Sequence, residues 1–501
     1  MRLAALTASA GLPVEARLNG PDADPLVTGF AIDHRKVAPG TVFGAFPGAR
    51  VNGEDFIPAA VSGGAVAVVA RPEACVKGAA HIADAEPRRA FAQLAARFFV
   101  PVPGTIVAVT GTNGKTSTVE LTRQLWRMAG VRAASIGTLG VTTPDETVPT
   151  GLTTPDIVTF LANMTGLARE GVTHVAYEAS SHGLSQFRNE GLAVAAGAFT
   201  NLSRDHLDYH ADMDDYFAAK MRLFDEVVGH EGAAVVWADD AWSPRAIAHG
   251  RARGLRLFTV GERGEGIRLV SATPGMLGQR LEIEHAGRRR GIELPLIGAY
   301  QAANALVAAG LVLTTGGDAD ATFDALARLQ PVRGRLERAA ITPAGAPVYV
   351  DYAHTPDALS AAIAALRPHV GGRLILVFGA GGDRDKGKRP DMGRIAAAEA
   401  DLAIVTDDNP RGEDPSAIRA QVLAGASERS LLREIGDRRD AIATAVAEAG
   451  RDDIVLIAGK GHEQGQLIGS GDAMRVLPFD DVAVARECAG GLGVGLGESD
   501  R

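Results

Sequence analysis

Residues 110–116, Thr-Gly-Thr-Asn-Gly-Lys-Thr, constrain the fold more than any other segment of this sequence. An apolar run at 106–109 precedes them, and a helical pattern with apolar Leu121 and Leu125 follows. A glycine-rich loop between a strand and a helix lets backbone amides and the helix N-terminus face phosphate oxygens. Val109 stands where the general P-loop pattern has its first glycine, so this is a shorter variant. The segment predicts a nucleotide-binding strand, loop and helix.

Several side chains in or near this loop suit a magnesium nucleotide. Lys115 supplies a positive charge for the outer phosphates, and the Thr116 hydroxyl can bind Mg²⁺. Glu178, which follows an apolar strand, adds a carboxylate oxygen of the kind that Mg²⁺ prefers. His206 is a less usual magnesium ligand, and its spacing fits either metal binding or structural hydrogen bonding. Lys220 lies in a helical stretch and, taken by itself, has the pattern of a solvated helix lysine.

Apolar strands alternate with helical segments in two long stretches, 105–320 and 345–485. Such alternation predicts mostly parallel sheets with helices on both faces, and shorter strands are expected in residues 1–100. Two prolines and a glycine at 101–104 mark a linker. We therefore expect an α/β protein of three domains, with a mostly parallel sheet in the second and a Rossmann-like third. The expected bounds are 1–102, 103–330 and 331–488, followed by a flexible tail at 489–501.

Four predicted strands of the C-terminal third each run into a charged or glycine-rich segment. The strands are 348–350, 374–378, 402–405 and 454–457, and the segments are 351–357, 379–389, 407–411 and 459–463. In open parallel sheets, ligands bind outside the carboxyl ends of the strands. Because every such end combines charges of both signs or glycine, the pattern predicts a small, polar, zwitterionic ligand.

Composition and charge exclude several other classes of protein. Lys and Arg number 51 and Asp and Glu number 60, so the net charge is −9, whereas nucleic acid requires a basic face. No window of about 18 apolar residues occurs, so we expect no membrane insertion. The two cysteines, Cys75 and Cys488, form neither a disulfide framework nor a zinc pattern. We expect a cytoplasmic protein, and a monomer.

Taken together, these segments resemble the Mur ligase family, and the likeness covers nearly the whole chain. It is carried by residues 33–35, 110–117, 152–155, 178–188, 201–210, 220, 304, 334–335, 351–359, 383–390, 408–411 and 459–463. The resemblance implies an N-terminal domain for the UDP end of a substrate, a central P-loop ATPase domain and a C-terminal domain for an incoming amino acid. Asp408-Asn409-Pro410-Arg411 is the segment that accompanies diaminopimelate rather than lysine in this family.

The resemblance also implies roles for single residues around ATP. The catalytic residues would be Lys115, His206 and Lys220, and Lys220 would carry a carbamate as N6-carboxylysine. Mg²⁺ would be bound by Thr116, Glu178, His206 and the carbamate of Lys220. The ATP-binding residues would be Gly111, Thr112, Asn113, Gly114, Lys115, Thr116, Ser117, Asn304, Arg335 and Asp351.

Two further sets follow from the resemblance. The UDP-linked substrate would contact Ile32, His34, Ala49, Arg50, Val51, Thr153, Thr154, Ser180, Gln186 and Arg188. Diaminopimelate would contact Arg384, Asp408, Asn409, Pro410, Arg411, Gly459 and Glu463. The chain departs from the family pattern at His34, where serine is usual, and at Trp237, where asparagine is usual.

The implied activity is an ATP-dependent, ADP-forming ligase of bacterial peptidoglycan precursor synthesis. It would join meso-2,6-diaminopimelate to UDP-N-acetylmuramoyl-L-alanyl-D-glutamate (UDP-MurNAc-L-Ala-D-Glu) through an acyl phosphate. Two alternatives belong to the same superfamily: a lysine-adding ligase and folylpolyglutamate synthetase. A third alternative is a P-loop ATPase acting as a motor or switch, which would leave the four charged strand ends unexplained.

Overall fold

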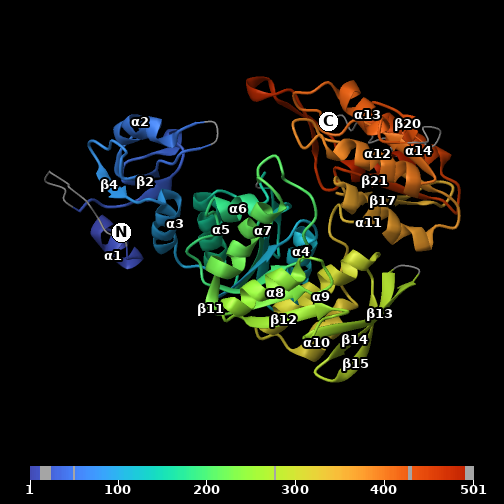
Figure 1. The fold of residues 1–501 in the computed structure, drawn as a ribbon, viewed down its shortest axis with the longest axis horizontal. Helices are drawn as coiled ribbons and strands as arrows, with labels where there is room; N and C mark the ends of the chain where they lie inside the picture. Colours follow the sequence, from blue (N-terminus) through green and yellow to red (C-terminus); the bar gives the residue numbers. More distant parts are fainter. Residues whose placement is uncertain (12–23, 49–50, 150, 276–277, 427–431, 491–501) are drawn as a thin grey trace, which may run out of the picture.

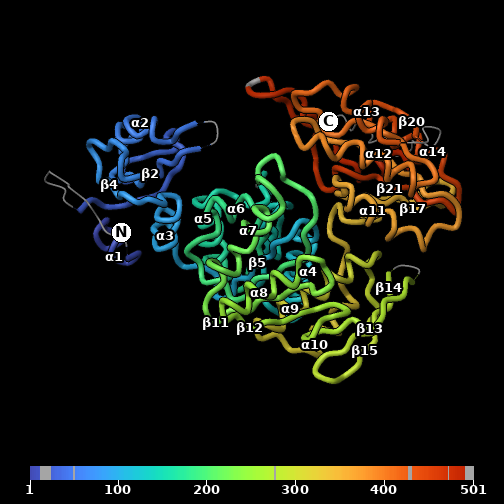
Figure 2. The backbone as a smooth tube through the Cα atoms, in the orientation of Figure 1, coloured from blue at the N-terminus to red at the C-terminus, as the bar shows by residue number. Residues whose placement is uncertain are grey.

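The computed structural model describes residues 1–11, 24–48, 51–149, 151–275, 278–426 and 432–490. Figure 1 shows three bodies in a row, each built around its own sheet. We call them the N-terminal region (1–99), the central region (105–329) and the C-terminal region (334–490). The tube in Figure 2 shows that they follow one another in chain order. No helix in the described ranges is long and apolar enough to cross a bilayer.

The N-terminal region is a four-stranded parallel sheet in the order β1-β2-β3-β4. Its strands are β1 (Gly29–Ala31), β2 (Thr41–Gly44), β3 (Ala65–Ala70) and β4 (Ala80–Ala83), and its helices are α1 (Leu3–Ala10), α2 (Ile57–Ser62) and α3 (Pro87–Phe98). In β3, Ala67 and Val69 belong to one apolar core and Ala65 and Val68 to another. Both faces of the strand are covered, which explains its unbroken apolar sequence.

The central region contains an eleven-stranded sheet in the order β15-β14-β13-β12-β11-β10-β5-β9-β6-β7-β8. Its strands are β5 (Thr105–Thr110), β6 (Ala133–Gly137), β7 (Gly140–Thr142), β8 (Thr147–Val148), β9 (His174–Glu178), β10 (Val194–Phe199), β11 (Val228–Trp237), β12 (Arg256–Gly261), β13 (Ile267–Gly275), β14 (Gly278–His285) and β15 (Arg288–Leu294). The seven strands from β13 to β6 are parallel and the outer pairs antiparallel, so the predicted mostly parallel sheet is confirmed.

Helices cover both faces of this sheet. They are α4 (Lys115–Met128), α5 (Ile157–Arg169), α6 (Ser181–Ser185), α7 (Met213–Arg222), α8 (Ser243–Ala252), α9 (Ala299–Thr314) and α10 (Ala319–Leu326). Alternate residues of β5 enter different cores: Ile106 packs on one face, and Val107 and Val109 on the other. This central position of β5 places the loop that follows it at the middle of the sheet edge.

The C-terminal region has a six-stranded sheet in the order β16-β17-β21-β18-β19-β20, in which only β16 is antiparallel. The strands are β16 (Glu337–Ile341), β17 (Pro347–Asp351), β18 (Leu374–Phe378), β19 (Leu402–Val405), β20 (Leu432–Glu434) and β21 (Ile454–Ala458), and the helices are α11 (Pro356–Leu366), α12 (Lys388–Glu399), α13 (Pro415–Leu423), α14 (Arg438–Glu448) and α15 (Asp481–Ala489). A separate hairpin joins β22 (Gly465–Ile468) to β23 (Arg475–Pro478). The four predicted strand ends therefore meet at one edge of one sheet. The predicted tail lies outside the described residues from position 491 onward.

Candidate active site

The phosphate loop has the predicted position between β5 and α4, which begins at Lys115. Gly114 adopts a φ of 85°, and a Cβ there would overlap Asn304 Oδ1. Gly111 adopts a φ of 145°, and a Cβ there would overlap Thr200 Oγ1. Both positions therefore require glycine, because the backbone is close to side chains from distant segments. The loop is also tied to the residues after β10, since Asn113 N donates to Asn201 Oδ1 at 2.9 Å.

Two lysines converge on this loop. The Lys115 ammonium donates to the carbonyls of Gly111 at 3.0 Å and Thr112 at 2.8 Å. The Lys220 amine donates to the same Gly111 carbonyl at 2.7 Å and lies 4.4 Å from the centre of the Tyr216 ring. Burial and the neighbouring Lys115 hold the pKa of Lys220 well below its usual range. The Lys220 side chain thus faces the loop after β5, and its environment favours the neutral amine.

The position of Lys220 corrects one interpretation of the sequence. Read by itself it had the pattern of a solvated helix lysine, yet it is only 1% exposed. The helix α7 carries it inward because Tyr216 and Phe217 on the same helix are also buried. Its contact with Gly111 spans 109 positions of sequence. A pattern confined to α7 could not reveal that contact.

Glu178, the last residue of β9, is held close to the loop. Its carboxylate is 1% exposed and accepts hydrogen bonds from the amide and the hydroxyl of Thr138, at 2.7 and 3.1 Å. Burial lowers the pKa of Lys115, and Glu178 and Asp205 oppose that effect, so these groups interact electrostatically. In the described ranges, no three His, Cys, Asp or Glu side chains are arranged to hold a metal ion. The oxygen groups near the loop include the Glu178 carboxylate and the Thr116 hydroxyl.

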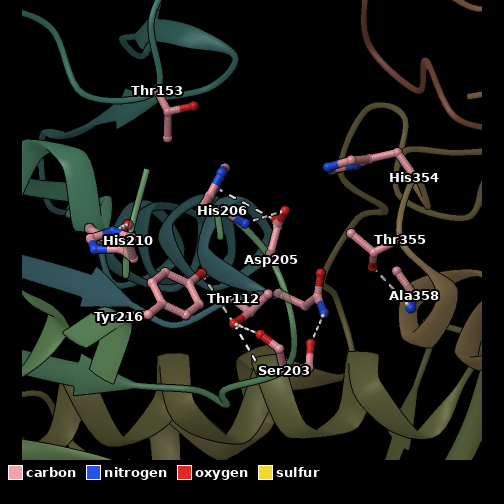
Figure 3. A network of polar contacts seen from close by, with 12 residues as sticks. Thr112, Thr153, Ser203, Asp205, His206, His210, Tyr216, His354, Thr355 and Ala358 are labelled. Carbon is pink, nitrogen blue, oxygen red and sulfur yellow. Dashed lines mark hydrogen bonds and ion pairs between the residues drawn. The ribbon is translucent and has the colours of Figure 1, made fainter. Parts of the chain in front are cut away.

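Asp205 and His206 lie between the central and C-terminal regions. Figure 3 shows them side by side, with His354 of the C-terminal region pointing toward them. Asp205 accepts from the backbone amide of His206 at 2.9 Å, and its carboxylate lies 3.6 Å from the His206 ring. Burial would raise the pKa of Asp205, but His206, His354 and Lys388 together lower it to about 2. Asp205 is a site residue that the sequence analysis did not single out, since its charged neighbours come from distant segments.

The predicted ATP residues come from both sides of this boundary. Asn304 on α9 is buried, and its carbonyl accepts from Thr118 of α4 at 3.5 Å. Arg335 Nη2 donates to the hydroxyl of Thr116 at 3.1 Å. Asp351, at the end of β17, accepts from the amides of Leu336 and Ala353 and from the Tyr300 hydroxyl. Burial raises the pKa of Asp351, opposed by Arg335. Residues of the C-terminal region thus reach the loop after β5.

Five residues predicted to bind the UDP-linked substrate form one hydrogen-bonded cluster beside Glu178. Their contacts are Thr153 Oγ1 with Thr138 Oγ1 at 3.1 Å, Thr154 Oγ1 to Glu178 O at 2.8 Å, Ser180 N to Thr154 Oγ1 at 3.1 Å, Arg188 Nη1 to Thr154 O at 2.8 Å, and Arg188 Nη2 to Gln186 Oε1 at 2.7 Å. The cluster occupies the loop that follows β8 and the segment after β9 that includes α6, next to the predicted metal ligand Glu178.

The remaining residues of that set lie in the N-terminal region. Ile32 is 39% exposed, Val51 is 57% exposed, and the His34 ring stacks on Phe56 with centroids 4.5 Å apart. Ala49 and Arg50 lie outside the described residues. The predicted substrate contacts are therefore split between two regions, as an extended substrate requires.

The predicted amino-acid residues come together at the edge of the C-terminal sheet. Asn409 Nδ2 donates to Glu463 Oε2 at 2.7 Å, which joins the ends of β19 and β21. A Cβ on Gly459 would lie 2.6 Å from Asp408 Oδ2. Burial lowers the pKa of Arg411, and the nearby Arg384 adds to this effect. The edge thus brings two arginines, Arg384 and Arg411, within electrostatic range of two carboxylates, Asp408 and Glu463.

Backbone conformation is unusual within this edge. Arg411 has a φ of 50°, and its Nη1 donates to Gly382 O at 2.9 Å. Pro410 is buried, and Asn409 Oδ1 accepts from Lys460 Nζ at 2.9 Å. Lys460 is itself fully buried and contacts Glu463 at 3.0 Å. The negative charge of Glu463 is therefore partly balanced by the buried ammonium of Lys460.

Comparison with known proteins agrees with this arrangement. Models of the Mur ligase middle domain, of the Mur ligase glutamate ligase domain and of the Mur ligase family catalytic domain match residues 109–312, 334–461 and 26–99. A relative from Zymomonas mobilis is 60% identical over 470 residues, covering 94% of this chain and 96% of the relative. The chain belongs to the Mur ligase family. That relative is named UDP-N-acetylmuramoyl-L-alanyl-D-glutamate–2,6-diaminopimelate ligase.

Further members of the family bear the same name. A relative from Bradyrhizobium diazoefficiens is 53% identical over 461 residues, covering 91% of this chain and 93% of its own length. A solved structure of that ligase superposes with a TM-score of 0.70 at 33% identity, covering 97% of this chain and 98% of the other. Folylpolyglutamate synthase of Mycobacterium tuberculosis complexed with ADP has a TM-score of 0.61 at 21% identity, covering 75% and 91%, and so shares the fold.

Proposed function

We propose that this chain is the ATP-dependent ligase that joins meso-2,6-diaminopimelate to UDP-N-acetylmuramoyl-L-alanyl-D-glutamate, forming ADP and phosphate. The observation that carries the proposal is the edge of the C-terminal sheet, where Arg411 interacts electrostatically with Arg384, Asp408 and Glu463. Diaminopimelate has an ammonium and a carboxylate at its distal end, so it matches both charges. Relatives of 47–60% identity carry the name of this activity.

The chemistry begins with a carboxylate, which is a poor acyl electrophile. The γ-phosphate of ATP passes to the D-glutamate γ-carboxylate, giving an acyl phosphate and ADP. The diaminopimelate amine then attacks the acyl carbon, the tetrahedral intermediate expels phosphate, and the attacking nitrogen loses a proton. Lys115 and the amides of the loop after β5 would stabilise the charge of the transferring phosphoryl group. Two solved structures of the same fold are complexes with ADP, which supports ATP as the co-substrate.

We also propose that Mg²⁺ is bound by Thr116, Glu178, His206 and a carbamate on Lys220. The first two supply oxygen atoms beside the phosphate loop, which is the chemistry that Mg²⁺ prefers. Bound ions would neutralise negative charge on the phosphates. Lys220 fits a carbamate because burial favours its neutral amine, the form that reacts with carbon dioxide. The neutral amine adds to carbon dioxide and loses one proton, so a buried neutral group becomes an anion next to Lys115.

The amino-acid site explains how lysine would be rejected. meso-Diaminopimelate differs from lysine by one distal carboxylate, and the planar guanidinium of Arg411 can bind such a group through two hydrogen bonds. Asp408 and Glu463 would hold the distal ammonium. A site with a half-buried cation such as Arg411 discriminates against an analogue that lacks the matching anion. The resulting preference separates this function from that of the lysine-adding ligases.

We also propose domain boundaries near 102–103 and 330–331. The first separates the N-terminal sheet from the central sheet, and the second separates the central sheet from the C-terminal sheet. In this arrangement the N-terminal domain binds the uridine end, the central domain ATP, and the C-terminal domain the amino acid. The proposed setting is the bacterial cytoplasm, where a monomer would contribute to peptidoglycan synthesis and cell wall biogenesis.

The test is a reconstituted reaction with the purified chain. ADP release should require ATP, UDP-MurNAc-L-Ala-D-Glu and meso-diaminopimelate together, and mass spectrometry should detect the UDP-tripeptide. Replacing diaminopimelate with L-lysine should reduce turnover strongly. Equal turnover with both amino acids would favour the lysine-adding alternative. ADP release that needs neither the UDP-dipeptide nor an amino acid would favour a motor or switch ATPase.

A further inference from the structure

The loop Asp408–Arg411 is held from one side by the hairpin of β22 and β23. Arg411 N donates to Leu467 O at 3.0 Å, and Gly469 N donates to Arg411 O at 2.7 Å. Leu467 N donates to Asn409 Oδ1 at 2.9 Å, and Gln466 Nε2 donates to Asp408 O at 2.7 Å. The hairpin therefore contacts all three members of the loop that are not proline.

This support matters because the loop has a costly backbone conformation. Arg411 is one of the few residues other than glycine with a positive φ, at 50°. A side chain in the left-handed region costs free energy, so the surrounding contacts must hold it there. Two of the four contacts from the hairpin are made to the backbone of Arg411 itself. Without the hydrogen bonds from the hairpin, the backbone of Arg411 could relax, and its side chain would change orientation.

The hairpin has few other contacts that would fix its position. β22 pairs with β23 in a two-stranded sheet, and Val476 and Leu477 of β23 are 63% and 46% exposed. In Figure 1 it is the red ribbon that projects from the C-terminal region. Isolated two-stranded hairpins are marginally stable in water. Gln466 contributes the only side chain of the hairpin among the four hydrogen bonds named above, and it is partly buried.

We propose that Gln466 is a positioning residue that sets the enzyme's selection of the distal end of diaminopimelate. Its amide nitrogen holds the carbonyl of Asp408, and this contact fixes the start of the loop that ends at Arg411. The proposal rests on the proposed function, because it concerns the same amino-acid site. Gln466 acts through the loop rather than by contact with the amino acid.

The chain offers a matched control two residues away. Gln464 is exposed, and its Nε2 lies 3.5 Å from Asp480, away from the loop. Gln466→Ala and Gln464→Ala therefore remove the same side chain from the same segment. Gln466→Glu keeps the shape but places an acceptor against the Asp408 carbonyl, so it should act at least as strongly as the alanine variant. All three variants should show the melting temperature of the wild-type chain within a few degrees.

Steady-state kinetics with each substrate varied in turn provide the test. Gln466→Ala should raise KM for meso-diaminopimelate about fivefold to tenfold, the usual effect of one lost hydrogen bond, with kcat changed less than about twofold. The preference for diaminopimelate over lysine should fall by a similar factor, and KM for ATP and for the UDP-dipeptide should stay unchanged. Gln464→Ala should match wild type in every constant.

Two results would overturn the proposal. One is a KM for diaminopimelate in Gln466→Ala equal to that in Gln464→Ala. The other is a parallel rise in KM for all three substrates, which would make Gln466 a general structural residue. Failure of the proposed function is distinguishable, because the wild-type chain itself would then form no UDP-tripeptide from diaminopimelate.

Discussion

Lys220 gives the sharpest prediction at the scale of a single residue. Its amine is buried against the Gly111 carbonyl and has a depressed pKa, so we expect it to act as a carbamate. Lys220→Ala should lower kcat about a hundredfold or more, because charge stabilisation near the phosphates is lost. Millimolar acetate or a similar short carboxylate should restore part of the activity. The exposed Lys77→Ala serves as control, and near-normal turnover of Lys220→Ala would contradict the carbamate.

Arg411 carries the prediction for amino-acid choice. Truncating one member of a buried charge pair costs roughly 2–5 kcal/mol, so Arg411→Ala should reduce kcat/KM for diaminopimelate about 30-fold or more. Activity with lysine should change much less, because lysine has no carboxylate for Arg411 to bind. Competition between the two amino acids, read by mass spectrometry, measures the ratio. Arg439→Ala, at an exposed arginine paired with Glu487, is the control.

Equal losses with both amino acids would give Arg411 a structural role. The contact of its guanidinium with Gly382 O makes that outcome a real alternative. Specificity would then have to come from Arg384 or Glu463.

Residues at strand ends were predictable, and residues defined by distant contacts were not. Asp351, Asp408 and Glu463 follow apolar strands, and parallel strands bring such positions together at one edge. The burial of Lys220 and the charged neighbours of Asp205 depend on contacts between segments far apart in sequence. The family resemblance supplied the role proposed for Lys220, whereas nothing in the sequence pointed to Asp205 as a separate residue.

The phosphate loop supports a prediction at the scale of an element. Gly114→Ala should raise KM for ATP about tenfold or more, because the new Cβ would displace Asn304 and the backbone has a φ of 85°. Gly130→Ala is a matched control, since Gly130 has a φ of 80° but no atom within 4 Å of the added Cβ. Both variants have an alanine at a positive φ, but only Gly114→Ala places a Cβ against the side chain of Asn304. Equal KM values for ATP in the two would show that strain alone matters.

The strands of the parallel sheets were the most predictable elements. The strands β18 and β19 have the predicted bounds, and β5 extends the prediction by one residue at each end. Their apolar sequences result from burial on both faces, which makes them easy to detect. The strands β7 and β8 and the hairpin of β22 and β23 were not predicted. They are short or exposed, and their sequences carry no periodic apolar signal.

At the scale of the whole molecule, the predicted ATP residues unite two regions. The loop after β5 and Asn304 belong to the central region, whereas Arg335 and Asp351 belong to the C-terminal region. The exposed Arg204 and the half-buried Asp385 lie 3.8 Å apart across the same boundary. Since an exposed ion pair contributes about 0–1 kcal/mol, such contacts do not lock the regions together. A nucleotide held by both sides would supply the missing attraction and exclude water from the acyl phosphate.

Arg335 should therefore couple ATP binding to the compactness of the molecule. Its guanidinium donates to Thr116 at 3.1 Å and lies 4.4 Å from the Tyr352 ring centre, so it spans from β5–α4 to the C-terminal sheet. We expect a non-hydrolysable ATP analogue with the UDP-dipeptide to reduce the radius of gyration of the wild-type chain in small-angle X-ray scattering. Arg335→Ala should keep the larger radius of gyration. It should also raise KM for ATP about tenfold or more, because the variant lacks a cation that would attract the ATP phosphates. Arg338→Ala, at an exposed arginine three residues along, should behave as wild type. Compaction of Arg335→Ala to the wild-type radius would show that closure is driven by other contacts, with Asp351 and the Arg204–Asp385 pair as the next residues to test.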